Sequence, residues 1–184
     1  FHDYNLYDGP VMEALEEMKQ RGWVKWTGVG GTTAHEMAKV IDTGVFDVVQ
    51  TAFNYSLLWQ EARYEIFPTA KKHDMGIICS APLQQGSLAV RRDELIENGA
   101  PWISKPRREQ FKALYSFLDE IGMSIVELSL RFVLSNPDID CVLVGAKNLK
   151  EITETVAYSE KGPLSEDILK RIEEIYMMVP FRPT

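Results

Sequence analysis

The 184-residue sequence has few of the features that indicate a metal site, a membrane span or a nucleic-acid binder. It has two cysteines, Cys79 and Cys141, and no CxxC or Cys/His spacing, so we predict no metal site. Each cysteine lies in an apolar run typical of a buried strand, and free buried thiols fit a reducing cytoplasm. No apolar run approaches the ~20 residues that a bilayer span requires, so we expect no association with a membrane.

Basic residues are also scarce relative to acidic ones. The chain has 20 Lys and Arg against 27 Asp and Glu, which gives a formal net charge of -7. Acidic chains repel phosphate backbones, so we expect no nucleic-acid partner. The basic cluster Lys105–Arg108 is too short to outweigh this balance, and we interpret it as the solvated start of a helix.

The sequence does contain a regular alternation of strand and helix patterns. Short, continuously apolar runs predict buried strands at 23–29, 46–50, 76–80 and 140–144. Helical spacing and capping residues predict helices at 10–22, 33–44, 60–73, 109–121 and 124–135, and further helices that begin after Asn148 and Ser165. This order is typical of a parallel sheet covered by helices.

Two α/β architectures compete for such a pattern, a doubly wound open sheet and a (β/α)8 TIM barrel. No GxGxxG follows the first strand, which disfavours a dinucleotide-binding half of the doubly wound kind. A full barrel needs about 250 residues, whereas this chain supplies roughly half of one. No internal repeat or low-complexity linker divides it, so residues 1–184 are predicted to form a single domain.

In both architectures, ligands bind at the carboxyl ends of the strands, so the residues there are candidate site residues. Gly30 and Gly31 would let a ligand approach the backbone closely, or form an ordinary turn. Gln50 could bind a ligand's amide or hydroxyl group, or make a structural hydrogen bond. The segment 80–88 combines turn formers with small polar groups, as a phosphate-contacting loop would. The segment 144–148 brings glycine, lysine and a helix N-terminus together, a physically sensible anion site.

His2 fits the same scheme if Phe1–Asp3 ends a strand whose start is missing. A histidine at that position would point into the mouth of a barrel and could hydrogen-bond a substrate carbonyl or help to set the pKa of a proton donor. A terminal residue without a role is the alternative.

These stretches together resemble the C-terminal part of an aldo/keto reductase, and the resemblance covers essentially the whole chain. The matching motifs follow the family order, and they are Gly22–Val29 (GWVKWTGV), Gln50 with Phe53–Leu58 (FNYSLL), Ala81–Leu88 (APLQQGSL), Leu130–Pro137 (LRFVLSNP) and Val144–Lys147 (VGAK) with Glu154 and Thr155. The resemblance implies a partial (β/α)8 TIM barrel, about strands 4–8 with their helices, and favours the barrel over the open sheet.

The resemblance implies an NAD(P)-dependent oxidoreductase that transfers hydride between a nicotinamide cofactor and a carbonyl or alcohol of a sugar or other small molecule. Of the family's catalytic Asp, Tyr, Lys and His, the histidine has a counterpart, at His2. Gln50 is similar to the glutamine that binds the nicotinamide carboxamide. Lys147 near the 2′ position would favour NADP, with NAD possible. The other implied cofactor residues are Pro82, Leu83, Gly86 and Ser87 over the pyrophosphate, with Gly145 and Glu154 at the adenosine end.

The sequence departs from the family pattern at three places. Gly30 and Gly31 stand where Ser-Asn is usual, Ser80 stands where a tyrosine stacks on the nicotinamide, and Thr155 replaces an asparagine. A subset of the family that oxidises sugars also lacks some of these groups, which hints at the substrate class.

The missing first strands, with the Asp, Tyr and Lys they would carry, imply that this chain alone does not perform the family's reaction. We therefore expect the N-terminal half of the barrel to be supplied in the same chain or by another one. The alternative is a non-catalytic half-barrel that serves as a binding or regulatory module.

Overall fold

The computed structural model describes residues 9–180 of the chain. Within that range the α-helices are α1 Pro10–Gln20, α2 Ala34–Ile41, α3 Ile66–Lys72, α4 Asp93–Asn98, α5 Lys105–Ile121, α6 Ile125–Leu134, α7 Leu149–Glu160 and α8 Glu166–Tyr176. The strands are β1 Gly28–Gly31, β2 Val48–Ala52, β3 Gly76–Ser80 and β4 Cys141–Leu143, and two short 3-10 turns are η1 Glu61–Arg63 and η2 Gln84–Gly86.

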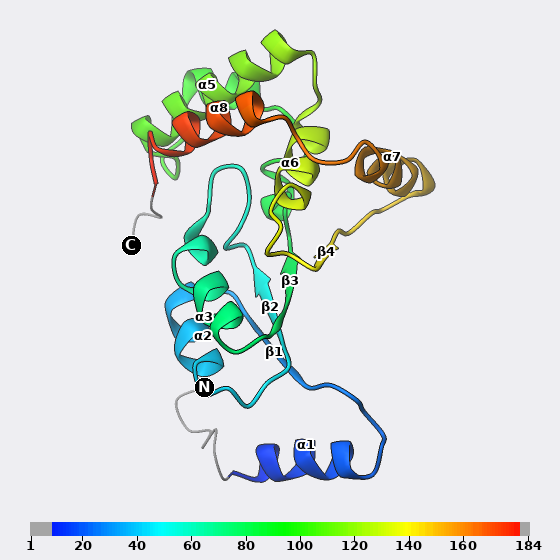
Figure 1. Cartoon of the computed structure of the whole chain (residues 1–184). Coiled ribbons are helices and arrows are strands. Elements are labelled where there is room, and N and C mark those ends of the chain that lie inside the picture. Colours follow the sequence, from blue (N-terminus) through cyan, green and yellow to red (C-terminus); the bar gives the residue numbers. More distant parts are fainter. Residues whose placement is uncertain (1–8, 181–184) are drawn as a thin grey trace.

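The strands form one parallel sheet whose spatial order, β1-β2-β3-β4, follows the chain. A doubly wound sheet reverses its strand order at a switch point, and no reversal occurs among these four strands. The helices α2 and α3 lie side by side along the sheet, while α5 and α8 lie together beyond it (Figure 1). The predicted partial barrel is confirmed over the open sheet.

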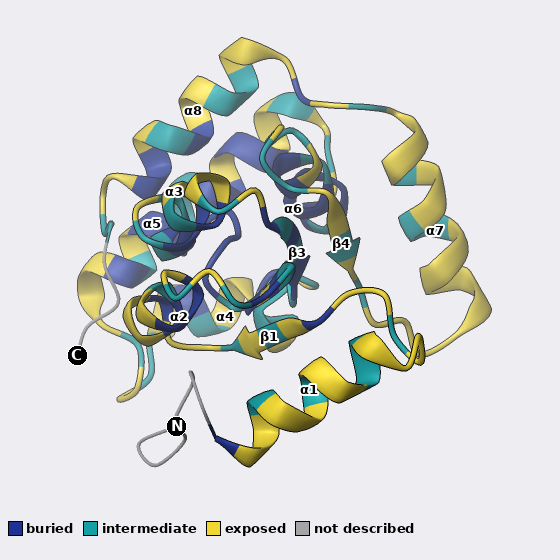
Figure 2. Ribbon diagram, turned by 60° about the horizontal axis from the view of Figure 1, so that its bottom comes forward, coloured by how far each residue is buried: buried dark blue, intermediate teal, exposed yellow. Residues whose placement is uncertain are grey.

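The two faces of the sheet differ in burial. Val49, Thr51, Ile77 and Cys79 point toward the helices and are fully or almost fully buried. Side chains of the opposite face, which would line the interior of a closed barrel, include the exposed Gln50, Cys141 and Leu143. Figure 2 shows the same division, with buried residues gathered between the sheet and its covering helices while α1 and α7 are largely exposed.

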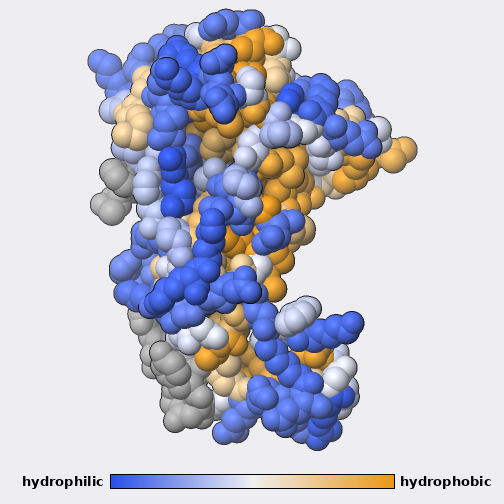
Figure 3. Space-filling model, in the orientation of Figure 1, coloured by the Kyte–Doolittle hydropathy of each residue, from blue (hydrophilic) through white to orange (hydrophobic). Residues whose placement is uncertain are grey.

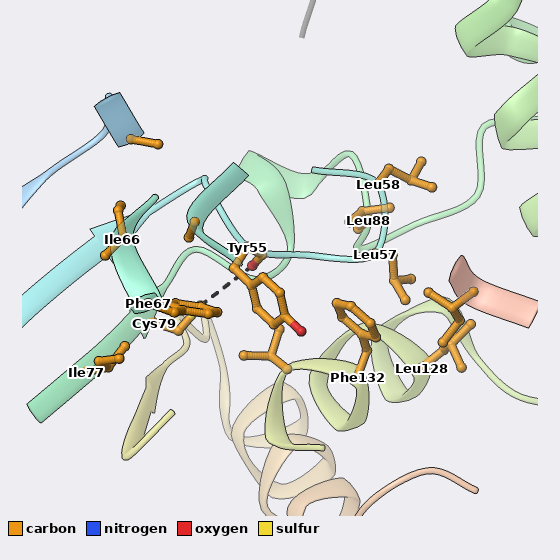
Figure 4. Packing of buried hydrophobic residues seen from close by; sticks show 14 of the residues in the cluster. Tyr55, Leu57, Leu58, Ile66, Phe67, Ile77, Cys79, Leu88, Leu128 and Phe132 are labelled. Carbon is orange, nitrogen blue, oxygen red and sulfur yellow. Dashed lines mark hydrogen bonds between the residues drawn. The ribbon is translucent and has the colours of Figure 1, made fainter. Parts of the chain in front are cut away.

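The core is built around an aromatic contact between three segments distant in sequence. The Tyr55 ring packs edge-on against Phe67 of α3 at 5.0 Å between centroids, and stacks on Phe132 of α6 at 5.2 Å (Figure 4). Cys79 of β3 lies beneath this group, and its thiol donates to the Tyr55 carbonyl at 3.6 Å. Tyr55 is buried among these rings, and this burial raises the pKa of its hydroxyl to about 12, so we assign Tyr55 to the core.

Side-chain caps fix the starts of three helices. The hydroxyl of Ser124 accepts from the Glu127 N–H at 3.1 Å, and Asn148 Oδ1 accepts from the Glu151 N–H at 2.9 Å, as their sequence motifs predict. Ser104 caps α5 in the same way. The predicted cap positions Thr33 and Ser165 do precede α2 and α8, but neither side chain makes a capping hydrogen bond.

Several predicted elements differ in their bounds from the observed ones: β2 covers Val48–Ala52 where a strand is expected at 46–50, and α5 begins at Lys105 where a helix is expected from Glu109. Two further elements differ most. The strand expected at 23–29 is limited to Gly28–Gly31, because Gly22, at φ +70°, turns the chain and the Trp23 N–H bonds back to Met18. The helix expected at 60–73 begins only at Ile66. Pro68 is the reason: without an N–H it is tolerated in a first turn but would break a longer helix. The sequence pattern does not predict the helix α4.

Two predictions of solvent exposure are also wrong. Cys141 is exposed, because it faces the inner side of the sheet, which no described residue covers. Arg107, expected at a solvated helix start, is buried, and its guanidinium donates to the Leu58 carbonyl at 3.1 Å and to Gln110. The surface around the open side of the sheet is strongly apolar (Figure 3). Within residues 9–180 no helix is long and apolar enough to cross a membrane.

An ion-pair cluster at Glu127 joins α6 to the end of α7. The carboxylate accepts from Arg131 at 2.9 Å and from Lys161 at 2.9 Å, and Arg131 also donates to the carbonyls of Gly162 and Pro163. Burial alone would raise the pKa of Glu127, but the hydrogen bonds from Lys161 and Arg131 outweigh it and hold that pKa below its ordinary value. The cluster therefore fixes where the chain turns toward α8.

Replacing Glu127 by glutamine should lower the free energy of unfolding by about 1–3 kcal/mol near neutral pH, since two cations lose their charged partner. A carboxyl whose pKa is lower in the folded state contributes stability above its unfolded pKa, and loses that contribution as pH falls through the folded value. Urea midpoints of wild type and Glu127→Gln should therefore converge in acid. Glu120→Gln, at an exposed carboxylate of α5, is the control; a gap that stays constant with pH would contradict the cluster's role.

Candidate functional site

The carboxyl ends of the four strands meet at one edge of the sheet because the strands are parallel and in register. Gly30 pairs with Gln50, and Gln50 with Ile78, while Ser80 at the end of β3 pairs with Leu143 of β4. Residues predicted from four separate stretches of sequence are thus neighbours in space. This edge is where ligands bind in barrels and in open α/β sheets.

The turn that follows β3 has an unusual backbone. Ala81, Gln84 and Gln85 are non-glycine residues with positive φ (56°, 48° and 54°), and Gly86 follows at φ 93°. The Gln84 amide holds the turn in place by donating to the Phe53 carbonyl and to Ser56 Oγ, both at 2.9 Å. Such conformations cost about 1–3 kcal/mol each and cluster at ligand sites, so this turn is a candidate ligand-contacting segment.

A cleft of about 630 Å³ lies between this turn and the first turns of α7. Its size is in the range of small-molecule and cofactor sites. We call it the strand-end cleft, and the predicted cofactor residues that line it are Pro82, Leu83, Gly86, Gly145, Lys147, Glu154 and Thr155. A Cβ added at Gly86 or at Gly145 would meet nothing within 4 Å, so both glycines leave open backbone facing the cleft.

Charges in the cleft are arranged around the N-terminus of α7. The Glu151 carboxylate accepts from the Lys147 N–H at 2.8 Å and from the Asn148 side-chain amide at 3.1 Å. The negative charge of Glu151 is therefore balanced by the positive end of the dipole of helix α7. The ammonium of Lys147 remains the cationic side chain of the cleft lining, and Glu154, paired with Lys150 at 3.8 Å, is a second acid further along α7. An anion bound here would have to meet Lys147 and the glycine-rich backbone, since the helix end is already capped.

Gln50 and Ser80 lie together on the inner face of the sheet, outside the lining of this cleft. The Gln50 amide donates to Ser80 Oγ at 3.2 Å, and the Ser80 hydroxyl donates to the Thr51 carbonyl at 3.4 Å. Gly30 lies beside Gln50, where an added Cβ would be 3.5 Å from the Gln50 Cβ. The geometry fits both roles considered for Gln50, ligand binding and structural support, because its side chain is exposed and also makes a hydrogen bond within the protein.

Two predicted site residues are placed elsewhere, and a third is not among the described residues. Gly31 is inside β1 and faces α2, where an added Cβ would lie 2.4 Å from Met37 Sδ, so close packing accounts for this glycine. Ser87 lines a second pocket on the other side of the turn, and its hydroxyl donates to the Gln84 carbonyl at 2.9 Å. His2 lies outside the described residues.

The cleft also contains residues that are not among the individually predicted cofactor residues. Phe53, at φ 65°, follows β2 and contributes to the wall, as do Gln84, Gln85 and Val126. Phe53, Gln84 and Gln85 lie within the family motifs quoted in the sequence analysis. Their positive φ values set them apart, but the residue types at these positions do not reveal such values. Among residues 9–180, no group of three or more His, Cys, Asp or Glu side chains could hold a metal ion.

The unreversed order of the four parallel strands, with a cleft at their carboxyl ends, places the chain in the TIM-barrel class. Residues 1–177 match the aldo/keto reductase family, and the chain belongs to that family of oxidoreductases. An aldo-keto reductase of Bacillus halodurans has a similar fold: its holo form superposes with a TM-score of 0.70 at 20% identity over 91% of this chain and 57% of its own.

Curated relatives include several dehydrogenases. L-galactose dehydrogenase of Arabidopsis thaliana is 27% identical over 90% of this chain and 52% of its own length. D-threo-aldose 1-dehydrogenase of a Pseudomonas species is 22% identical over 86% and 48%, and pyridoxal 4-dehydrogenase of Microbacterium luteolum is 24% identical over 88% and 47%. The chain spans about half the length of the curated relatives it matches.

The backbone of Gly86 offers a direct test of strain in the turn. Gly86→Ala should lower the free energy of unfolding by about 1–2 kcal/mol, since an L side chain is strained at φ 93°. Gly145→Ala is the matched control, because its surroundings are equally open and its φ is not positive. Urea unfolding measures both. Equal midpoints for the two variants would show that the turn relaxes freely.

Proposed function

We propose that this chain forms the cofactor-binding C-terminal part of an NAD(P)-dependent aldo/keto reductase. The observation that carries the proposal is the strand-end cleft, which gathers predicted cofactor residues from two loops about 60 residues apart, after β3 and after β4. Membership of the aldo/keto reductase family supports an oxidoreductase, and the reaction we propose is hydride transfer between a nicotinamide cofactor and a carbonyl or alcohol.

The described residues fit a dinucleotide at four points. The open backbone of the Gly86 turn suits the close approach of a pyrophosphate, because glycine has no side chain to hold the ligand away, although the Gly86 N–H itself already donates to the Leu83 carbonyl at 2.9 Å. Lys147 suits an adenosine phosphate, and the acid Glu154 suits the amino group of adenine. The inner face of the sheet, at Gln50, suits the carboxamide of the nicotinamide. A positive charge near the 2′ position favours NADP over NAD.

The catalytic groups of the proposed enzyme are divided between this chain and the part of the barrel that precedes it in the family order. The family's Asp, Tyr and Lys belong to that part, and His2 would join them at the barrel mouth. The tyrosine would donate the proton and the lysine would tune its pKa, while this chain binds the cofactor that supplies hydride.

An N-terminal half-barrel, in the same chain or in another, is the partner that the exposed surfaces suit. Both outer strands of the sheet have unpaired edges within the described residues, and open edges are a liability in water. Leu143 on the inner face is 45% exposed, and α7 presents an exposed apolar stripe of Leu149, Ile152 and Val156. α1 has no buried residue. These surfaces are the ones that further strands and helices of a barrel would cover.

The substrate class is a small carbonyl compound or sugar. The names of the relatives that oxidise L-galactose, an aldose or pyridoxal support this class. We place the enzyme in the cytoplasm, because Cys79 is a free, buried thiol that suits a reducing compartment.

A second candidate function is a nucleotide-binding or regulatory module without catalysis. The strand-end cleft favours it, since the described residues that line this cleft could bind a nucleotide without any further catalytic group. NADPH oxidation with an aldose or an aromatic aldehyde separates the two candidates. Turnover by the purified protein, or by this chain with an N-terminal half-barrel added, supports the enzyme. Nucleotide binding without turnover in either preparation supports the module.

Lys147→Ala should weaken NADPH by about tenfold and NADH much less, because it removes the charge that meets the 2′-phosphate. Calorimetric titration of this chain with 2′,5′-ADP and with 5′-ADP isolates the adenosine end, which needs only the strand-end cleft. Lys170→Ala makes the same charge change on α8, away from the cleft, and should change neither affinity. Equal weakening of both nucleotides by Lys147→Ala would remove the 2′-phosphate role.

Gln50→Ala should weaken NADPH and NADH alike, by about threefold to tenfold, because the amide would serve the carboxamide that both cofactors share. Gln20→Ala, on the exposed face of α1, is the control. Fluorescence titration with both cofactors measures the effect. Unchanged affinities together with a lower unfolding midpoint would show that Gln50 acts through its hydrogen bond to Ser80 alone.

A further inference from the structure

A second pocket, of about 650 Å³, lies on the other side of the turn after β3. We call it the aromatic pocket. Its walls come from α4, α5 and the loops before them, and the residues that characterise it are Trp59, Trp102, Phe111, Tyr115, Arg92 and Ser104. It shares Gln85 with the strand-end cleft, but Ser87 faces it while Gly86 faces the cleft. The two spaces are separated by this single turn.

The aromatic side chains that form the walls of this pocket are held in position by packing against one another. Trp59 and Phe111 pack edge-on at 6.3 Å between centroids, and Phe111 packs edge-on against Tyr115 at 5.9 Å. The Arg107 guanidinium lies 4.9 Å from the Trp59 ring and fixes its position. Aromatic walls held in place by their neighbours offer flat surfaces at a low entropic cost of binding.

The short helix α4 is also fixed against α5. The Arg92 N–H donates to the Tyr115 hydroxyl at 3.1 Å, and the Arg91 side chain pairs with Asp93 at 2.7 Å while lying over the Tyr115 ring. Lys112 of α5 pairs with Glu97 of α4 at 3.1 Å. The pocket is therefore a formed space between two joined helices, of the size in which small molecules bind.

Trp102 differs from the other aromatic residues of the pocket in its exposure to solvent. It lines the pocket and yet is 74% exposed, among the most exposed large apolar side chains in the described part of the chain. An exposed tryptophan at the rim of a formed aromatic pocket is typical of a group that becomes covered when the pocket is filled.

The positive charge of the side chains that line the pocket favours a negatively charged ligand. Among the described lining residues, the charged side chains are Arg92 and Arg107, in a chain whose formal net charge is -7. Arg107 is buried and already bonded to Leu58 and Gln110, so it contributes a fixed positive potential. Arg92 is exposed and can meet a carboxylate directly.

We infer that the aromatic pocket binds a flat aromatic carboxylate, at a site separate from the strand-end cleft. Aromatic rings of the ligand lie among Trp59, Phe111 and Trp102, and the carboxylate faces Arg92. The site does not depend on the cofactor, so it goes beyond the proposed reductase function.

Calorimetric titration of the full 184-residue chain with 2-naphthoate, and with the uncharged 2-naphthamide, tests the site without any nucleotide. Trp102→Ala should weaken both compounds by at least about tenfold, since it removes an anchoring ring. Arg92→Gln should weaken 2-naphthoate by about threefold to fivefold and leave 2-naphthamide unchanged. Both residues are exposed, so neither variant endangers folding.

Trp23→Ala is the control, because Trp23 is a similarly exposed tryptophan outside the pocket. It should leave both affinities unchanged. The inference is overturned if 2-naphthoate shows no saturable binding at millimolar concentration. It is also overturned if Trp23→Ala and Trp102→Ala weaken binding equally, or if Arg92→Gln affects both compounds alike.

Discussion

The burial of one face of the parallel sheet is the constraint on which the rest of the structure depends. Side chains such as Val49, Ile77 and Cys79 are removed from water and packed under helices that come from both halves of the described chain. Each large apolar side chain buried in this way stabilises the fold by about 1.5–3 kcal/mol. A shift of one residue would turn these side chains to the bare face, so burial fixes the register. The register in turn brings every strand end, and the loops that follow, to one edge of the sheet.

The sequence predicts those elements whose signals are local. β3 was predicted with its observed bounds, and the starts of α6 and α7 follow from the caps Ser124 and Asn148, because a cap acts within four residues. Cys141 could not be predicted in the same way. Its apolar run indicates a strand with two covered faces, and the cover of the inner face is not among the described residues. An apolar pattern records that a face becomes buried, but not by which part of a molecule.

The candidate site shows the same limit. The family motifs predict the segments that form the strand-end cleft, and Gly86, Gly145 and Lys147 do come together there. Ser87, adjacent to Gly86 in sequence, faces the other pocket, because consecutive positive φ values reverse the chain within the turn. The aromatic pocket could not be found from sequence, since its rings come from positions 59, 102, 111 and 115 on separate segments.

The two cysteines differ in their exposure to solvent, so that a thiol reagent can report on the uncovered face of the sheet. Burial raises the pKa of the Cys79 thiol to about 12 and shields it from reagents, whereas Cys141 is exposed on the inner face beside Ile78. Alkylating reagents act on accessible thiolates, so they discriminate between the two thiols in the folded chain. Any segment or partner that lies on that face protects Cys141 and leaves Cys79 unchanged. The chain thus carries a labelling site that reports whether its half-barrel is covered.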